Sequence, residues 1–373
     1  MKKISAIEGF RGWLAWMVVL AHVVEVVDAQ GVWRILGEIG HPAVIMFVIV
    51  SGYVITHRVI ERPEPYPIYV LRRFMRIFPL FSVTCFIGYF TSQIYASSLT
   101  RLPWAHDDSF VTRVLLHTEF AKSARDFLWQ NIASHAVMLH GITPPVIAPL
   151  SAVVYNPPAW SISLEWQFYL VAPFVVALAR RGLASLWGAG VLALLEAAYR
   201  LKFHTEGPLI GAAGFFALGI ASRIFHPWMM GRLERPNFVL AVILVLMPLC
   251  PAAFPIFCWV AFMCGLVFVP PKAQTFARLY RVAFASRVMN YLGSRSFSTY
   301  LCHFPILSVC LALWVKLAPG SGRVATFLAL AAAMVPLTIA VSELLYRFVE
   351  KPGISLGTWL VSRPRISFPG TVT

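Results

Sequence analysis

The chain has 373 residues, of which 59% are hydrophobic and only 13% are charged. A soluble globular domain carries about 25% charged residues, so this composition excludes an ordinary soluble globule and indicates a protein that crosses a membrane several times. The formal net charge of +15 does not indicate a nucleic-acid partner. The basic residues lie between apolar segments, where the orientation of membrane helices accounts for them.

The first apolar run begins close to the N-terminus and shares some features with a secretory signal peptide. Two lysines precede it, but Glu8 and Arg11 interrupt it and no Ala-x-Ala cleavage site follows near Ala29. We therefore expect this run to be retained as a membrane helix.

Within this first helix, Arg11 and His22 stand eleven residues apart. This separation is close to three helical turns, so both side chains lie on one face, about 16 Å apart along the axis. Ionisable groups inside a membrane are costly and are therefore candidates for a function. The alternative for His22 is a packing role, with a hydrogen bond to a neighbouring helix.

Over the whole chain, ten apolar stretches are long enough to cross about 30 Å of hydrocarbon. They cover roughly residues 12–28, 41–60, 77–97, 164–180, 183–199, 208–224, 237–251, 254–270, 297–316 and 324–346. With a cytoplasmic N-terminus, the inner connections hold more than twice as many Lys and Arg residues as the outer ones, in line with the positive-inside rule. The sequence thus predicts an all-α polytopic membrane protein with about ten transmembrane helices and cytoplasmic N- and C-termini. We assign residues 1–350 to a single transmembrane domain and residues 351–373 to a short cytoplasmic tail.

The longest connection, residues 98–163, falls on the predicted outer side. It contains several tryptophans, two Pro-Pro pairs and both acidic and basic side chains. We expect it to form a partly ordered cap that faces lipid headgroups or a glycan.

The densest basic cluster precedes the third predicted membrane helix. On a helix, Arg73 and Arg76 share a face at spacing i, i+3, and Arg72 meets Arg76 at spacing i, i+4. Guanidinium groups bind phosphate oxygens through directional, charge-assisted hydrogen bonds. The cluster therefore suits a nucleotide-like cofactor at the cytoplasmic surface. The alternative is an orientation signal that also contacts anionic lipid.

Two further places in the later predicted helices carry side chains suited to catalysis or cofactor binding. Glu165 opens the fourth predicted helix from the outer side, and a carboxylate there could orient the imidazole of His22. Tyr300 and His303 share a face of the ninth helix, where Pro305 should bend it, and could line a cofactor entrance. The alternatives are a glutamate that faces water and a histidine that hydrogen-bonds the backbone freed by the proline.

Several motifs are absent from the sequence. It has no Gly-x-Ser-x-Gly elbow, no Walker loop, no His-Glu-x-x-His and no dinucleotide fingerprint, which argues against a serine hydrolase, a P-loop ATPase, a zincin and a Rossmann dehydrogenase. The six cysteines lie in or beside apolar runs without metal-type spacing, so we expect no metal site and no disulfide framework. Glu343 and Arg347, at spacing i, i+4, favour a structural ion pair.

Six motifs follow one another in chain order: Glu8-Gly9-Phe10-Arg11 with His22, Ser51-Gly52-Tyr53-Val54-Ile55, Arg72-Arg73-Phe74-Met75-Arg76, Trp160-Ser161-Ile162-Ser163-Leu164-Glu165, Tyr300-Leu301-Cys302-His303 and Tyr346-Arg347-Phe348-Val349-Glu350-Lys351-Pro352. As an ordered set they resemble the acyltransferase type 3 family of integral membrane O-acyltransferases, bacterial enzymes that esterify surface glycans and related acceptors. The family's usual Asp-Gly-Leu-Arg opening stands here as Glu8-Gly9-Phe10-Arg11, which keeps the acid, the glycine and the arginine.

The resemblance implies an acyl-coenzyme A donor, most often acetyl-coenzyme A, that approaches from the cytoplasm of a bacterium and acylates a hydroxyl beyond the inner membrane. The nucleotide end would stay on the arginine cluster while the thioester reaches His22 along the face of Arg11. His22 would act as general base with Glu165 as its orienting acid, or would carry the acyl group itself.

The acceptor is open at this point: exopolysaccharide, lipopolysaccharide, an oligosaccharide signal and a macrolide all fit these residues. Two other classes of protein stay open as well. One is a transporter of a lipid-linked sugar or an acyl carrier, although no inverted repeat is visible. The other is a non-catalytic scaffold among glycan-assembly proteins.

Overall fold

A computed structural model describes residues 5–28, 32–181, 207–230, 253–267 and 274–362, with a few isolated positions between them. Every regular element in these ranges is a helix, so the predicted all-α class is confirmed. The main helices are α1 (Ser5–Val26), α2 (Val32–Glu38), α3 (Gly40–Glu61), α4 (Tyr66–Leu99), α5 (Asp108–Asp126), α6 (Leu128–Ala136), α7 (Trp160–Ala179), α9 (Ala213–Met229), α11 (Phe254–Val267), α12 (Gln274–Ala285), α13 (Arg287–Ser294), α14 (Ser296–Leu317), α15 (Arg323–Leu345) and α16 (Lys351–Ser362).

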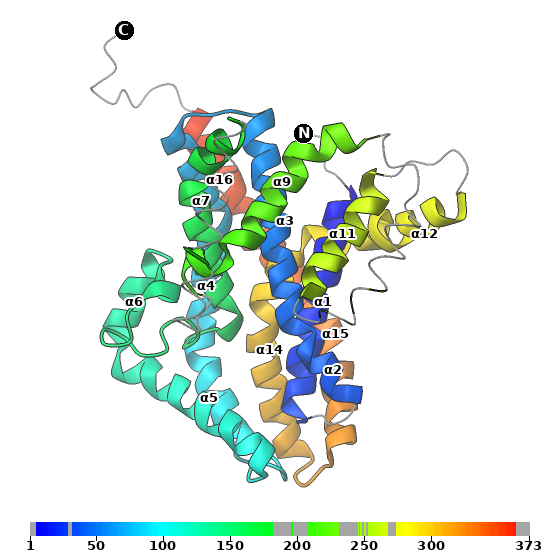
Figure 1. Cartoon of the computed structure of the whole chain (residues 1–373). Coiled ribbons are helices and arrows are strands. Elements are labelled where there is room, and N and C mark those ends of the chain that lie inside the picture. Colours follow the sequence, from blue (N-terminus) through cyan, green and yellow to red (C-terminus); the bar gives the residue numbers. More distant parts are fainter. Residues whose placement is uncertain are drawn as a thin grey trace.

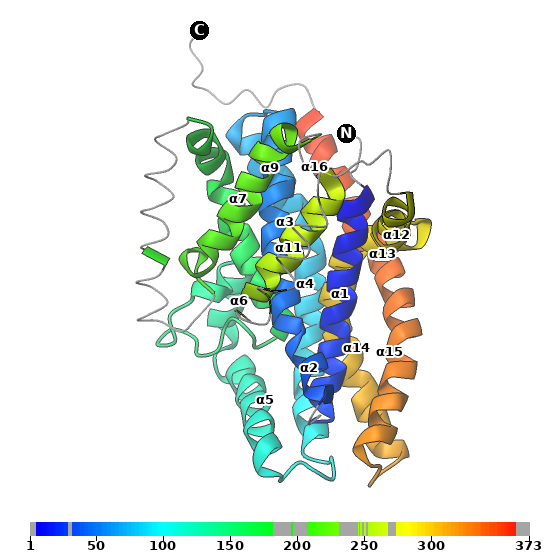
Figure 2. The ribbon, with the colours of Figure 1, turned by 45° about the vertical axis from the view of Figure 1, so that its right-hand side comes forward.

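The long helices form a bundle that shares one main axis (Figures 1 and 2). The start of α1 and all of α16 lie at one end of this bundle, which is drawn at the top of both views. Helix α5 lies toward the opposite end.

Seven helical stretches within the described ranges are long and apolar enough to cross a membrane. They coincide with seven of the ten predicted segments, and α11 is a shorter apolar helix at the predicted segment 254–270. The predicted segments 183–199 and 237–251 lie almost entirely outside the described residues. The count of ten and the sidedness of the termini therefore stay predictions.

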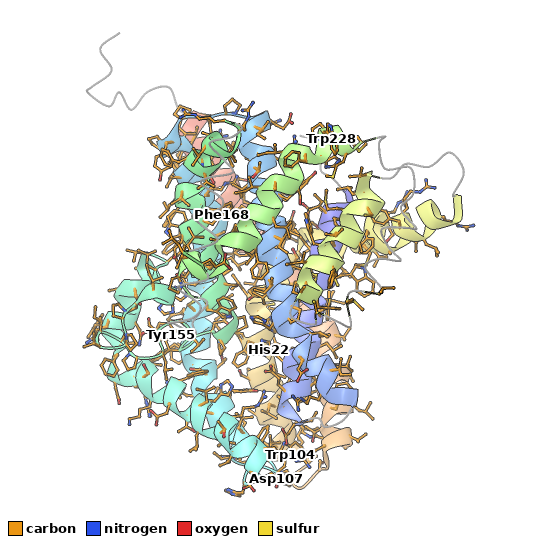
Figure 3. The ribbon with its side chains drawn as sticks, viewed as in Figure 1. His22, Trp104, Asp107, Tyr155, Phe168 and Trp228 are labelled. Carbon is orange, nitrogen blue, oxygen red and sulfur yellow. The ribbon has the colours of Figure 1, made fainter. Side chains whose placement is uncertain are left out.

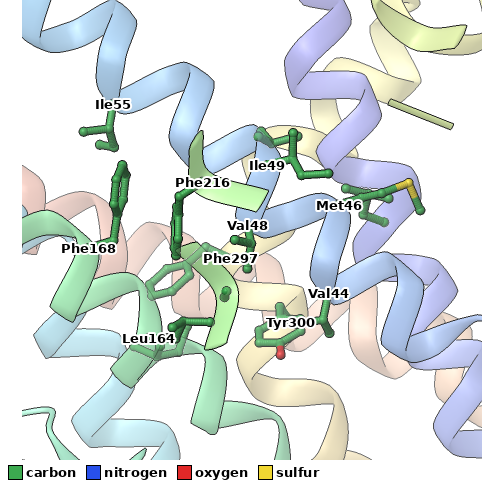
Figure 4. Close-up of a cluster of buried hydrophobic side chains, with 14 of the residues drawn as sticks. Val44, Met46, Val48, Ile49, Ile55, Leu164, Phe168, Phe216, Phe297 and Tyr300 are labelled. Carbon is green, nitrogen blue, oxygen red and sulfur yellow. The ribbon is translucent and has the colours of Figure 1, made fainter. Parts of the chain in front are cut away.

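The helices around the bundle centre enclose a shared apolar core. Figure 4 shows side chains of α3, α7, α9 and α14 meeting there, among them Val48, Phe168, Phe216 and Phe297. The rings of Phe168 and Phe216 stack with their centroids 4.0 Å apart. This core holds the start of α7 against α3 and α9, which decides the position of Glu165.

Close backbone contact pairs α3 with α9. A Cβ atom on Gly219 would lie 2.1 Å from the carbonyl oxygen of Ile49, and one on Gly52 would lie 2.5 Å from that of Phe216. Only glycine permits this approach, which is a common device of membrane helix pairs.

The long connection between α4 and α7 is folded into helices. It contains α5, α6 and a 3₁₀ turn at Pro157–Ala159 that leads directly into α7. Its start is tied to the far ends of other helices, because the indole N–H of Trp104 donates to the carbonyl of Val26 (3.1 Å) and Arg323 pairs with Asp107 (2.6 Å). The cap expected from the sequence is thus a set of helices held against the bundle.

The last helical stretch bends inward at a π-helical turn, Tyr346–Glu350, between α15 and α16. This turn carries the buried side chain of Glu350 toward α14, where the hydroxyl of Ser298 donates to its carboxylate (2.7 Å). Helix α16 packs on α4, with Gly353 and Gly357 both facing Met75. Residues 351–362, which the sequence assigns to a tail, are therefore helical and contact the helix that bears the arginine cluster.

Candidate functional site

A cavity of about 260 Å³ lies between α1, α3, α4, α7, α14 and the π-helical turn. Apolar side chains of α3 and α9 form part of its wall. Its charged lining consists of four arginines and three glutamates: Glu8, Arg11, Arg58, Arg73, Arg76, Glu165 and Glu350. A concentration of charge this deep in an apolar bundle is costly and indicates a binding site.

The two central cations of the cavity are Arg73 and Arg76 on α4. Neither forms an ion pair within the described part of the chain. The guanidinium carbon of Arg73 lies 6.0 Å from the ring centroid of Tyr69 and 5.8 Å from that of Tyr169, and its buried Nε has no hydrogen-bond partner there. The three glutamates of the same lining attract Arg76 electrostatically but form no ion pair with it. A buried guanidinium group that no carboxylate contacts directly is unfavourable, so these two arginines suit an anionic ligand.

Arg72 does not line the cavity. Its guanidinium pairs with Glu64 at 2.7 Å, and Glu64 also pairs with Arg58 at 3.3 Å. The structure therefore separates Arg72 from Arg73 and Arg76, and places Arg58, which the sequence did not single out, beside them.

Glu165 lies in the second turn of α7 and lines the same cavity. Its carboxylate accepts hydrogen bonds from the hydroxyls of Ser51 (3.0 Å) and Tyr169 (2.5 Å). The predicted contact between Glu165 and His22 is wrong, because the carboxylate that bonds His22 belongs to Glu25.

The depth of α7 explains this error. The sequence places the start of this helix near the outer surface, but the segment before it is anchored inside the bundle on α14. The hydroxyl of Tyr300 donates to the carbonyl of Pro158 (2.8 Å) and also lies 2.8 Å from the Ser161 hydroxyl. The amide of Asn156 donates to the carbonyl of Leu301 (2.9 Å). These contacts carry Glu165 to the level of the cavity arginines.

His22 lies well inside the bundle (Figure 3). Its Nδ1 is 3.0 Å from Oε2 of Glu25, one turn further along α1. An ionised carboxylate can only accept, so Nδ1 donates the proton and Nε2 carries the lone pair. In the described structure Nε2 has no hydrogen-bond partner.

Rings on α14 connect the cavity to His22. Tyr300 is part of the cavity lining, and its ring centroid lies 6.0 Å from that of His303. The ring of His303 in turn stacks on His22, with centroids 5.2 Å apart. Arg11 lines the cavity from the α1 side. His22 itself lies beyond the lining, one stacked imidazole away from the Tyr300 wall.

His303 is fully buried and keeps one nitrogen unpaired. Its Nδ1 lies 3.3 Å from the carbonyl oxygen of Thr299, so Nδ1 donates and Nε2 is a buried acceptor without a partner among the described residues. The carbonyl that Pro305 leaves free is that of Leu301, four residues earlier, and Asn156 satisfies it. His303 is therefore not needed to repair the helix at the proline.

Sequence reasoning missed Glu25 as the partner of His22 and Glu350 as a wall of the cavity. The signal for Glu25 is its i, i+3 spacing from His22, which puts the two side chains on one face. Nothing in the sequence indicates that a π-helical turn directs Glu350 inward. The structural pair of Glu343 and Arg347 is confirmed, and Glu343 also pairs with Arg295 at 2.7 Å.

A family model described as an acyltransferase domain matches residues 4–347, which is nearly the whole chain. The chain belongs to the acyltransferase type 3 family. Searches of curated proteins and of solved structures found no significant match. This acyltransferase type 3 protein is a multi-pass membrane protein of a family of O-acyltransferases. Within the described residues, no group of three or more His, Cys, Asp or Glu side chains could hold a metal ion.

Proposed function

We propose that this protein transfers an acyl group, most often acetyl, from acyl-coenzyme A to a hydroxyl of a carbohydrate or glycolipid. One observation carries the proposal. His22 has one nitrogen fixed by Glu25 and the other free, and its ring is joined through His303 and Tyr300 to a cavity lined by arginines. A base beside an anion-binding cavity is what acyl transfer from a phosphorylated donor requires.

The donor's phosphates would bind Arg73 and Arg76, whose charges have no ion-pair partner among the described residues. The cavity volume of about 260 Å³ is below the roughly 300–1,000 Å³ of sites that enclose a drug-sized ligand. It therefore suits a phosphate-bearing or pantetheine part of coenzyme A rather than the whole molecule. Tyr300 and His303 would line the route of the thioester toward His22.

In the proposed reaction, Nε2 of His22 takes the proton of the acceptor hydroxyl as its oxygen attacks the thioester carbonyl. The carbon–sulfur bond breaks, and the thiolate of coenzyme A receives that proton from the imidazolium. Glu25 holds the ring in the tautomer that can accept. In a two-step variant, Nε2 attacks the thioester carbonyl, the carbon–sulfur bond breaks and the thiolate of coenzyme A leaves. The acceptor hydroxyl then attacks the acyl-imidazole, the bond between Nε2 and the acyl group breaks, and the proton of the hydroxyl goes to the thiolate.

We place the protein in the bacterial inner membrane, with the start of α1 and the cavity on the cytoplasmic side. The excess of Lys and Arg in the predicted inner connections supports this orientation. The acceptor, a surface polysaccharide or lipopolysaccharide unit or a related hydroxyl compound, would then approach from the side of α5 and α6.

The test uses purified full-length protein in lipid nanodiscs, radiolabelled acetyl-coenzyme A and a glycolipid extract as acceptor. We expect label to move to the acceptor with the wild-type protein and not with His22→Ala, at equal protein abundance. Substantial transfer by His22→Ala would contradict the proposal. Loss of one ester group from surface glycans of cells without the protein, seen by mass spectrometry, would identify the acceptor. A transporter or a scaffold would leave the acyl group on coenzyme A.

A further inference from the structure

Helix α5, from the long connection between α4 and α7, contacts the His22 site directly. Nη1 of Arg113 lies 3.1 Å from Oε2 of Glu25. This is the same oxygen that bonds Nδ1 of His22 at 3.0 Å. One carboxylate oxygen thus receives two donors, one from its own helix and one from α5.

The position of α5 beside the end of α1 is fixed by separate contacts. The hydroxyl of Ser109 donates to Asp28 at 2.5 Å, and Arg323 of α15 lies 3.6 Å from the same carboxylate. Arg113 is further placed by its own helix, since its guanidinium carbon lies 6.0 Å from the ring centroid of Phe110. Arg113 therefore reaches Glu25 from an anchored helix.

One turn beyond Arg113 on α5, the uncharged ring of His117 also lies near His22, with Phe304 between them. Burial, and secondly the charge of Arg113, lower the pKa of His117 to about 3, so it carries no charge at physiological pH. Its ring stacks on Phe304 with centroids 5.9 Å apart, and Phe304 meets the ring of His22 edge-on at 5.6 Å. Helix α5 thus brings one permanent charge, that of Arg113, to the His22 site.

We propose that Arg113 is a positioning residue for acyl transfer: it fixes the Glu25 carboxylate and thereby the orientation of the His22 ring. This inference rests on the proposed function and makes α5 a part of the active site. The ion pair is partly exposed, with side-chain exposures of 32% for Arg113 and 35% for Glu25, and such pairs contribute little to stability. We therefore expect the ion pair of Arg113 and Glu25 to affect mainly the orientation of the His22 ring.

Arg113 and Glu25 carry opposite charges, so removing one or the other should shift the pH dependence of the rate in opposite directions. Within the described part of the chain, the titratable and charged groups around His22 are Glu25 on its own helix, Arg113 and His117 on α5, His303 on α14 and Tyr95 on α4, which interacts with both Glu25 and Arg113. A carboxylate nearby favours the protonated imidazole, and a guanidinium disfavours it. Since a general base must be neutral, the acidic limb of the rate profile reports this balance.

The experiment measures kcat and KM for acetyl-coenzyme A between pH 5 and 9 on the purified full-length protein. We expect Arg113→Gln to lower kcat roughly 10- to 100-fold, as small misplacements of catalytic groups do, with an unchanged KM. Its acidic limb should move to higher pH, whereas that of Glu25→Gln should move to lower pH. Arg113→Lys keeps the charge and should keep the limb of the wild type. The control is Arg125→Gln, at an exposed position of the same helix.

A folded Arg113→Gln protein with the kcat and acidic limb of the wild type would overturn the proposal. So would a fall in thermal stability together with unmoved limbs in Arg113→Gln and Glu25→Gln, which is the result of a purely structural pair. If Arg113→Gln does not fold, Arg113→Met, which keeps the length of the side chain and removes its charge, takes its place with the same expected fall in kcat and the same expected shift of the acidic limb. Wild-type protein without His22-dependent transfer would instead refute the proposed function itself.

Discussion

At the scale of single residues, the two central arginines of the cavity differ from their neighbour in one decisive respect. Arg73 and Arg76 have no ion-pair partner in the described part of the chain, whereas Arg72 is paired with Glu64 at 2.7 Å. An unpaired buried cation gains most from an arriving phosphate, because no internal ion pair has to be broken first. A paired one has its charge already compensated.

This difference predicts unequal effects of three matched substitutions. Arg73→Ala and Arg76→Ala should each raise the KM for acetyl-coenzyme A about 10- to 100-fold, since a hydrogen bond to a charged group contributes roughly 1.5–3 kcal/mol. Arg72→Ala should raise it less than threefold. Steady-state kinetics with varied donor would show this, and equal effects at all three positions would indicate that the cluster serves only to orient the helix in the membrane.

At the scale of the element, the start of α7 shows where sequence reasoning succeeds and where it fails. The apolar run of α7 and its Trp-Ser-x-Ser-Leu-Glu opening are visible in the sequence. The apolar run is helical as predicted, and the helix begins at Trp160, four residues before the predicted start. Its depth is not visible, because it depends on Asn156 and Pro158, which bond to groups on α14 more than a hundred residues away. Counting residues from a presumed surface therefore placed Glu165 too far outward.

The same distinction between features set by local spacing and features set by packing between helices holds for other elements. The extent of a membrane helix and the residues on one of its faces depend on local spacing, so the sequence predicts that Arg11 and His22 share a face of α1. Partners across helices depend on packing, so Arg113 on α5 and Glu350 on the π-helical turn were not. Glu25 lies at spacing i, i+3 from His22, so local spacing alone predicts this pair, whereas the sequence analysis assigns the orienting role to Glu165 on another helix.

The revised depth of α7 predicts which kinetic property Glu165 controls. Because its carboxylate bonds Ser51 and Tyr169 beside the cavity and does not contact His22, Glu165→Gln should leave the acidic limb of the pH–rate profile unmoved. The substitution should change the KM for the donor through the charge of the cavity wall. Glu25→Gln, measured alongside, should move the limb. A limb displaced by Glu165→Gln would restore the role that the sequence first suggested.

At the scale of the whole molecule, the structure separates the charged cavity from the contact of Glu25 with Arg113 along the bundle axis. The charged cavity lies toward the start of α1, and the contact of Glu25 with Arg113 lies toward its end, with the rings of Tyr300, His303 and His22 between them. A donor bound by phosphates and an acceptor bound beside α5 would meet at His22 from opposite ends. Neither would have to cross the bundle.

This arrangement functions as proposed only if the two ends face opposite compartments, which labelling can test. In a cysteine-free chain, single cysteines at Arg62, in the connection between α3 and α4, and at Lys122, on the exposed side of α5, report the two ends. A membrane-impermeant thiol reagent should label Lys122→Cys in spheroplasts and Arg62→Cys only after the membrane is opened. The reverse pattern would place the arginine-lined cavity outside, away from cytoplasmic acyl-coenzyme A. Labelling of both sites in sealed cells would mean that the connections before and after α4 share one side, and would refute the assignment of α4 as a single crossing.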